Sequence, residues 1–111
     1  MSASAEFVAY TKDQLSALGP LGEGVFFGGF AFRKDGVQFA MVMGNTLYLR
    51  VDDLSRPHFE AQDMSAFSYM TRRGRVRVKT YYAVPEMVLE DSHTLVHWAR
   101  EALRAASAKS K

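Results

Sequence analysis

Two histidines near the C-terminus have a spacing that could support metal chemistry. His93 and His97 stand four residues apart, so a helix would place both imidazoles on one face, as in zinc proteases. Those enzymes place a glutamate directly after the first histidine, and this chain has Thr94 there. We therefore interpret the pair as two partly exposed histidines of a helix and expect no metal site.

The stretch Asp91-Ser92-His93 contains the residue types of a hydrolase triad. A triad converges in space from separate segments, however, and three neighbours at the start of a helix cannot meet at one point. Asp91 and Ser92 fit better as residues that cap the helix. The acid pair Asp52-Asp53 likewise precedes an expected helix, where carboxylates bind free N–H groups. We expect no catalytic residue, and an enzyme is the remote alternative.

Glycines cluster between positions 22 and 29, which raises the question of a phosphate-binding loop. A dinucleotide fingerprint that began at Gly22 would need glycine where Phe27 stands, and a triphosphate loop from Gly24 would need lysine where Phe30 stands. The segment also precedes a strand, whereas phosphate loops follow a strand and open a helix. The chain has no cysteine, which excludes thiolate metal sites and disulfides. We expect no cofactor.

The run from Arg72 to Lys79 is the most suggestive feature of the sequence. Strand alternation places every second residue on the face opposite the core, and a neighbouring strand would extend this face. A mixture of tyrosines and cations is typical of protein interfaces. The candidate interface consists of Tyr48, Arg50, Arg75, Arg77, Lys79 and Tyr81.

Protein binding through this face, by a homodimer or by a partner protein, is our preferred hypothesis. The alternative is a nucleic-acid-binding module that uses the strand from Arg72 to Lys79, because cations interleaved with aromatic rings bind phosphates and stack on bases. A third interpretation is a solvated strand whose charges prevent edge-to-edge aggregation. Charge is uneven: residues 1–66 carry five basic and eight acidic side chains, whereas residues 67–111 carry nine and four. An acidic partner would explain this asymmetry, but a difference of this size also arises without function.

Hydrophobic periodicity and turn residues indicate an α+β domain. The predicted helices cover residues 4–18, 54–62, a turn after Pro85, and a long segment from Asp91 or Ser92. The predicted strands cover residues 25–34, 37–43, 47–51, 67–70 and 75–82. The expected fold is an antiparallel sheet of about five strands with helices packed on it, in the order α-β-β-β-α-β-β-α.

Gly28 and Gly29 are the structural motif of the first predicted strand, where glycine is unfavourable. Without a Cβ, the strand can form a bulge or let a helix or a neighbouring chain approach closely. A bulge here would shift the side-chain register by one, which would explain why the surrounding phenylalanines do not alternate with polar residues. In the next strand we expect Met41 in the core and Ala40 and Val42 on the outer face.

An ordered set of short motifs resembles the N-terminal domain of the TfoX/Sxy family of competence regulators. No single motif is specific, but the set follows the family's order over roughly residues 5–106. The motifs are Phe27-Gly28-Gly29-Phe30, Leu47-Tyr48-Leu49-Arg50-Val51-Asp52-Asp53, Phe67-Ser68-Tyr69, Tyr81-Tyr82 with Val84-Pro85-Glu86, and Trp98-Ala99 with Ala102-Leu103. Ala31 stands where the family usually repeats a glycine.

The resemblance implies a fold similar to that of secretion chaperones. It also implies an accessory role in the transcription of DNA-uptake genes, exerted with a transcription factor rather than through a DNA-reading helix of the chain itself. We expect a single-domain member spanning residues 1–111, with an ordered core over 5–106, a frayed tail over 107–111 and no second, helical domain. The first residues lack a basic segment followed by an apolar one, so we expect a cytoplasmic protein without a membrane segment.

Overall fold

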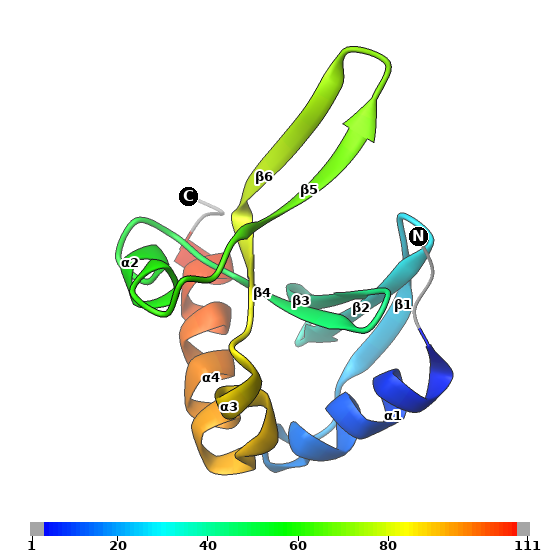
Figure 1. Ribbon diagram of the computed structural model, residues 1–111. Helices are drawn as coiled ribbons and strands as arrows, with labels where there is room; N and C mark the ends of the chain where they lie inside the picture. The colour runs from blue at the N-terminus through cyan, green and yellow to red at the C-terminus, as the bar shows by residue number, and fades with distance from the viewer. Residues whose placement is uncertain (1–3, 109–111) are drawn as a thin grey trace.

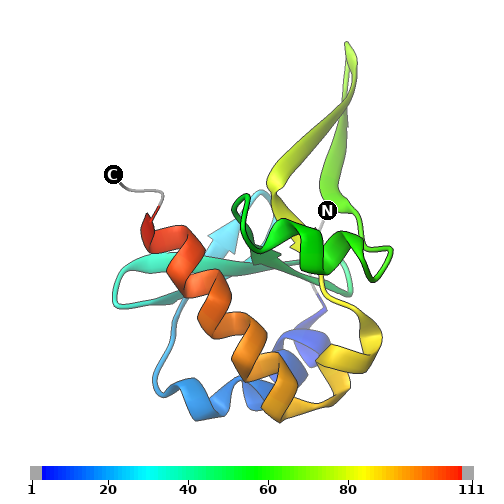
Figure 2. The same cartoon turned by 90° about the vertical axis from the view of Figure 1, so that its left-hand side faces the viewer.

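The computed structural model describes residues 4–108 and has the α+β architecture expected from the sequence (Figure 1). The strands are β1 (Gly22–Phe26), β2 (Gly29–Lys34), β3 (Val37–Met43), β4 (Thr46–Arg50), β5 (Ala66–Thr71) and β6 (Gly74–Ala83). The helices are α1 (Ala5–Gln14), the 3₁₀ turn η1 (Ser16–Leu18), α2 (Arg56–Glu60), α3 (Glu86–Glu90) and α4 (Ser92–Ala108). The strands form one antiparallel sheet in the order β1-β2-β3-β4-β6-β5, and α1, α3 and α4 lie on one side of it (Figures 1 and 2).

The N-terminal helix is divided, although the sequence predicted one helix over 4–18. The Ser4 hydroxyl caps α1 by accepting a hydrogen bond from the Phe7 N–H at 3.3 Å. After Gln14 the chain tightens into η1, which ends at Gly19, where φ is 89°. Glycine adopts this positive φ at little cost, so the predicted stop at Gly19 is confirmed.

The C-terminal helix α4 begins at Ser92, in agreement with the predicted start at Asp91 or Ser92, and packs a stripe of small and apolar residues on the sheet. Leu95, Ala99 and Ala102 are almost fully buried. The helix continues through Ala108, so residues 107 and 108 are helical although the sequence placed them in a frayed tail. Residues 109–111 of that predicted tail lie outside the described residues.

The sheet has a sixth strand because the predicted strand over 25–34 is a hairpin. Phe27 and Gly28 form a two-residue turn between β1 and β2, with φ of 52° and 77°. Positive φ at both central residues is the conformation of type I′ hairpin turns. The predicted bulge at Gly28 and Gly29 is therefore wrong, because Gly28 belongs to a turn.

Gly29 does allow a close approach, as expected from the sequence, but the segment that approaches it is the adjacent strand β3 and not a helix. A Cβ on Gly29 would collide with the carbonyl oxygen of Val42 and with Sδ of Met43, both in β3. Only glycine lets β2 lie this close to β3 here.

A bulge does occur, but it lies in β3. The register between β2 and β3 shifts at Phe39, which has no partner in β2. As a result Phe39 and Ala40 both pack into the core beneath the helices, together with Val42, while Met41 faces the opposite side of the sheet. The expectation that Ala40 and Val42 face outward is wrong for this reason, because one extra residue exchanges the two faces.

The sheet separates two apolar clusters. The main core lies between the sheet and the helices and includes Leu15, Phe32, Leu49 and Leu95. A smaller cluster lies on the other face, and all its described members come from strands. It consists of Met41, Met43, Phe67 and Tyr81, with Phe26, Tyr48 and Val78 packed against them.

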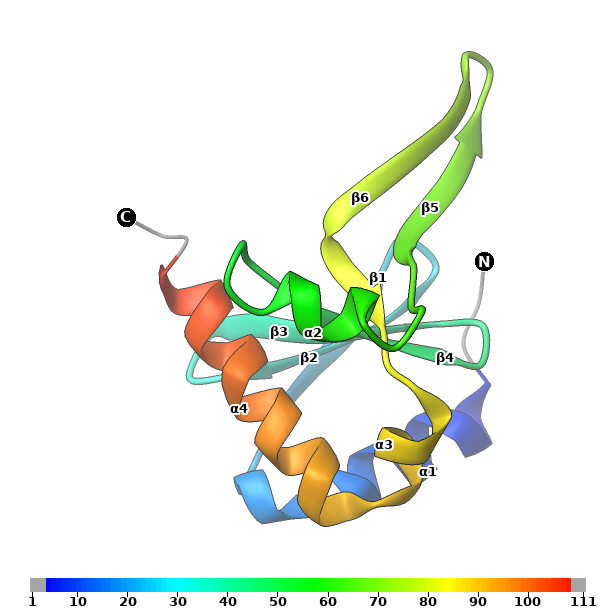
Figure 3. The same ribbon diagram turned by 60° about the vertical axis from the view of Figure 1, so that its left-hand side comes forward.

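The hairpin of β5 and β6 projects beyond the rest of the sheet, as all three ribbon views show (Figures 1–3). β6 pairs with β4 only over residues 81–83, and with β5 mainly over residues 74–78. Between these stretches the register skips, so that residues 79–81 have no partner in β5. We call residues 67–79 the arm. Among residues 4–108, no helix is long and apolar enough to cross a membrane.

Candidate interaction surface

The sheet face opposite the helices carries five aromatic rings in contact, which we call the aromatic row: Phe26, Phe27, Tyr69, Phe67 and Tyr48. Ring centroids are 4.7 Å apart for Phe26 and Phe27, and 6.3 Å apart for Phe27 and Tyr69. Tyr69 and Phe67 follow at 6.0 Å, and Phe67 meets Tyr48 edge to face at 5.2 Å. These separations are those of interacting aromatic pairs. The row therefore joins the β1–β2 turn to the arm.

Part of this row is open to solvent. Within the row, the exposed fraction is 68% for Phe27 and 39% for Tyr69. Val76, which lies next to the row, is 37% exposed. Val76 pairs with Tyr69 across the arm, so the two side chains lie on the same face. Together these residues extend the apolar surface of the buried cluster outward onto the arm.

Phe27 is also strained. Its φ of 52° lies in the left-handed region, where a bulky side chain is an outlier that costs about 1–3 kcal/mol. Asparagine and glycine are the usual residues of such a turn. An exposed aromatic ring is thus held at a position that a small polar residue would occupy with less strain.

One predicted interface residue, Tyr48, belongs to the aromatic row, and two others, Arg50 and Tyr81, lie beside it. Tyr48 is half-buried, and burial raises the pKa of its hydroxyl above the usual value. The Arg50 guanidinium stacks over the Tyr81 ring at 5.6 Å from its centroid. Tyr81 itself is only 6% exposed, and its hydroxyl accepts a hydrogen bond from Nε2 of Gln38 at 3.1 Å. The expectation that Tyr81 is an exposed interface residue is therefore wrong, because Arg50 and the smaller apolar cluster that includes Met41 and Met43 cover it.

The predicted cations of β6 lie elsewhere. Arg75, Arg77 and Lys79 are exposed, and Arg75 donates a hydrogen bond from Nη1 to Oγ of Ser68 at 2.8 Å. Alternation along β6 places Arg75 and Arg77 on the face of the arm opposite Val76. We call this the back of the arm.

The six predicted interface residues therefore do not share one face. The prediction assumed that alternation continues unbroken from Arg75 to Tyr81. The register skip over residues 79–81 instead puts Val78 and Tyr81, three positions apart, in the same cluster. Lys79 lies within this skip.

Phe27 and Tyr69 are functional candidates that sequence reasoning missed. Both belong to motifs of the family resemblance, but neither was included in the predicted interface, which followed the alternation of β6 and β4. One signal was available in β5, whose six residues carry no charge although edge strands usually do. An uncharged edge strand is a surface that other chains can recognise.

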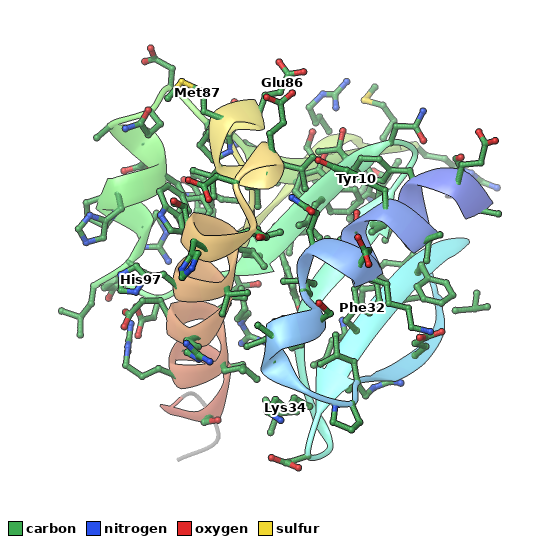
Figure 4. All side chains as sticks on the ribbon, turned by 90° about the horizontal axis from the view of Figure 1, so that it is seen from below. Tyr10, Phe32, Lys34, Glu86, Met87 and His97 are labelled. Atoms are coloured by element: carbon green, nitrogen blue, oxygen red, sulfur yellow. The ribbon has the colours of Figure 1, made fainter. Side chains whose placement is uncertain are left out.

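The residues first considered for metal or catalytic chemistry are dispersed on the helical side of the molecule. His93 and His97 are exposed on α4, where Figure 4 labels His97. Within residues 4–108 no group of three or more histidines and carboxylates could hold a metal ion. Asp91 accepts a hydrogen bond from the Thr94 hydroxyl at 2.9 Å, and this bond lowers the pKa of its carboxyl, as expected of a residue at a helix start.

A pocket between α2 and α4 is bordered by His58, His97 and Trp98. Its volume of about 210 Å³ is below the 300–1,000 Å³ typical of small-molecule sites. The aromatic row, in contrast, is an extended surface. Two other hollows, one beside His93 on α4 and one beside α1, have volumes of about 500 and 400 Å³, which lie within that range, so volume does not decide between a small ligand and a macromolecule.

Comparison with protein-family models matches residues 13–106 of the chain to the TfoX N-terminal domain. A search of curated proteins found no match.

Proposed function

Because the chain belongs to the TfoX N-terminal domain family, we propose that it is an accessory regulator of transcription that acts by binding a partner protein. The partner contacts the aromatic row and the adjacent exposed surface of the arm. The resemblance favours a transcription factor as this partner and DNA-uptake genes as the targets. The proposed role requires neither a cofactor nor a catalytic group.

The observation that carries this proposal is Phe27, an exposed aromatic ring at positive φ. Backbone strain of this kind is found where a ligand or partner is held. Phe27 also touches Tyr69, so two exposed rings from opposite edges of the sheet meet at one place. Large apolar rings that lie together and are rimmed by arginine are typical of the centre of a protein interface.

The test is the variant Phe27→Asn. Asn followed by Gly28 suits a type I′ turn, so the variant should fold with a melting temperature equal to or above that of the unchanged chain. It nevertheless removes the exposed ring. We expect at least tenfold weaker binding of the partner, which is first captured from a lysate of the native cells and then titrated by calorimetry. Target transcripts should fall in cells that carry the variant.

Tyr10→Asn is the matched control, because Tyr10 is a 41% exposed aromatic residue on α1 (Figure 4), the helix at the end of the molecule opposite the arm (Figure 1). It should leave partner binding and transcript levels unchanged. Equal partner binding by the unchanged chain, Phe27→Asn and a second variant, Tyr69→Ser, would overturn the proposal. Sedimentation velocity tests whether the aromatic row binds a second copy of this chain instead. A dimer that Phe27→Asn dissociates would identify the partner as that second copy.

A further inference from the structure

The arm is a concentrated and unneutralised source of positive charge. It carries five exposed cations, whereas residues 64–85 contain no aspartate or glutamate. The ion pairs found among residues 4–108 all involve other cations, namely Lys12, Arg56 and Arg104. The five cations are Arg72, Arg73, Arg75, Arg77 and Lys79.

Hydrogen bonds hold the tip and the back of the arm in place. The tip of the arm is the turn formed by residues 71–74. There the Thr71 hydroxyl accepts a hydrogen bond from the Arg73 N–H at 3.1 Å and donates one to the Gly74 carbonyl at 2.9 Å. On the back, Arg75 is bound to Ser68, which lies opposite Arg77 in the register. The cations are therefore presented by an ordered two-stranded ribbon.

We propose that the back and tip of the arm bind double-stranded DNA, with the ribbon lying in the major groove. This groove is about 12 Å wide and admits a two-stranded β-ribbon. The ribbon projects clear of the helices, so the body of the molecule does not obstruct it (Figure 3). Arg75 and Arg77 are separated by two residues of strand, about 6.6 Å, which is close to the axial rise of two nucleotides, about 6.8 Å.

The division of the arm into two faces favours duplex over single-stranded nucleic acid. Single-strand binders place aromatic stacking platforms among their cations. Here the exposed ring of Tyr69 lies on the face opposite Arg75 and Arg77, and the Tyr81 ring is buried beneath Arg50. The back of the arm therefore offers cations without stacking platforms, which suits the phosphates that border a groove.

Charge at the other end of the molecule supports an approach with the arm first. The helices α1 and α3 lie opposite the arm (Figure 1), and Figure 4 shows Glu86 on this side. α1, α3 and the residue after α3 carry five acids and one cation, Lys12, which forms an ion pair with Glu23. The acids are Glu6, Asp13, Glu86, Glu90 and Asp91. A DNA duplex would repel this end and attract the arm. The site uses the back of the arm, so it is independent of the protein partner proposed for the aromatic row.

The experiment measures fluorescence anisotropy of a labelled 20-base-pair duplex between 50 and 200 mM salt. We expect binding at low salt with a slope of log K against log salt of about −4, because each phosphate contact contributes about −0.9. The variant with Arg75→Gln and Arg77→Gln should bind at least tenfold more weakly at 50 mM salt, with the slope reduced in magnitude by about 2. The control, Lys34→Gln with Arg100→Gln, removes the same charge from the body and should change the affinity less than twofold.

The inference would be overturned by no binding of the duplex at 50 mM salt, or by an equal loss of DNA affinity in the two double variants. Tighter binding of a single strand of the same length would also overturn it. Equal competition by polyglutamate would indicate that the ligand is an acidic protein instead. Melting temperatures of both variants establish that they fold. Phe27→Asn should retain full DNA affinity. Loss of partner binding in that variant together with intact DNA binding thus separates the two proposals.

Discussion

At the scale of single residues, the motif Phe27-Gly28-Gly29-Phe30 contains three positions that are constrained in two different ways. Phe27 and Gly28 need positive φ because they form the turn. Gly29 does not have positive φ, and it is required because β3 lies against it. The two glycines are therefore present for separate reasons, one conformational and one steric.

Gly29→Ala should destabilise the protein by about 2–3 kcal/mol, because the added methyl group meets the backbone oxygen of Val42, which cannot move aside without distorting β3. Thermal unfolding followed by circular dichroism should show a melting temperature lower by about 8 °C or more. Gly22→Ala is the control, since a Cβ there would lie 3.6 Å from Cβ of Arg33, an ordinary contact. Equal melting temperatures for the two variants would contradict the steric argument.

Asp52 joins the loop before α2 to the C-terminal helix. Its carboxylate accepts two hydrogen bonds from Arg104, at 2.8 and 3.2 Å, and one from the N–H of Ser55 at 3.0 Å. The Arg104 hydrogen bond is the main reason that the pKa of Asp52 lies well below its usual range. A carboxyl with a lower pKa in the folded state contributes stability above its unfolded pKa of about 4, and this contribution disappears as the pH falls below that value.

Asp52→Asn should therefore cost about 1 kcal/mol at pH 7, a figure reduced for solvent screening because the side chains of Asp52 and Arg104 are 28% and 37% exposed. The difference from the unchanged chain should shrink as the pH is lowered from 5 to 2. Urea unfolding at a series of pH values measures it. Asp53→Asn is the control, since the Asp53 side chain is 97% exposed and forms a surface ion pair with Arg56. A pH-independent difference for Asp52→Asn would show that its ionisation does not matter.

At the scale of elements, the arm is less buried than the central strands of the sheet. β3 and β4 lie between two strands and two apolar clusters. β5 is an edge strand, and the part of β6 that pairs with it is mostly exposed. The arm therefore depends on its own hairpin hydrogen bonds and on the ring contacts of the aromatic row.

Hydrogen exchange should reveal this difference. Hydrogen-bonded amides of the arm should exchange at least 100-fold faster than those of β3, because segments with few buried contacts open without global unfolding. The measurement is residue-resolved exchange by NMR at two protein concentrations, and the β3 amides serve as the internal reference. Equal protection of the arm and β3 would mean that the arm is covered in solution, and protection that rises with concentration would point to self-association.

At the scale of the whole molecule, the sheet separates a supporting side from a side available for contacts. The helices α1, α3 and α4 lie against one face (Figure 2) and share the main core with the strands. On the other face, the smaller cluster of rings, methionines and Val78 comes only from strands within residues 4–108. The arm extends from this arrangement with rings on one face and arginines on its back. If both proposals hold, one hairpin contacts a regulatory protein and the DNA on which that protein acts, which is a physical basis for an accessory role.

Local chemistry along the chain was sufficient to predict most elements. Asp35-Gly36 and Gly44-Asn45 form two-residue turns, as glycine beside Asp or Asn favours, and α4 begins at Ser92, one of the two predicted starts. Motif order was sufficient to identify the family, which the match over residues 13–106 confirms. These features depend on neighbours in sequence, so propensity and spacing contain the necessary information.

Only the tertiary structure decided which faces meet. The extra residue at Phe39 and the skip over residues 79–81 each exchange the two faces of a strand, and alternation read from the sequence carries such an error to every later position. That is why Ala40 and Tyr81 proved buried and why Arg77 lies on the back of the arm. The contact of Phe27 with Tyr69 joins residues 42 positions apart in the chain, and it depends on the curl of the whole sheet, which no local pattern contains.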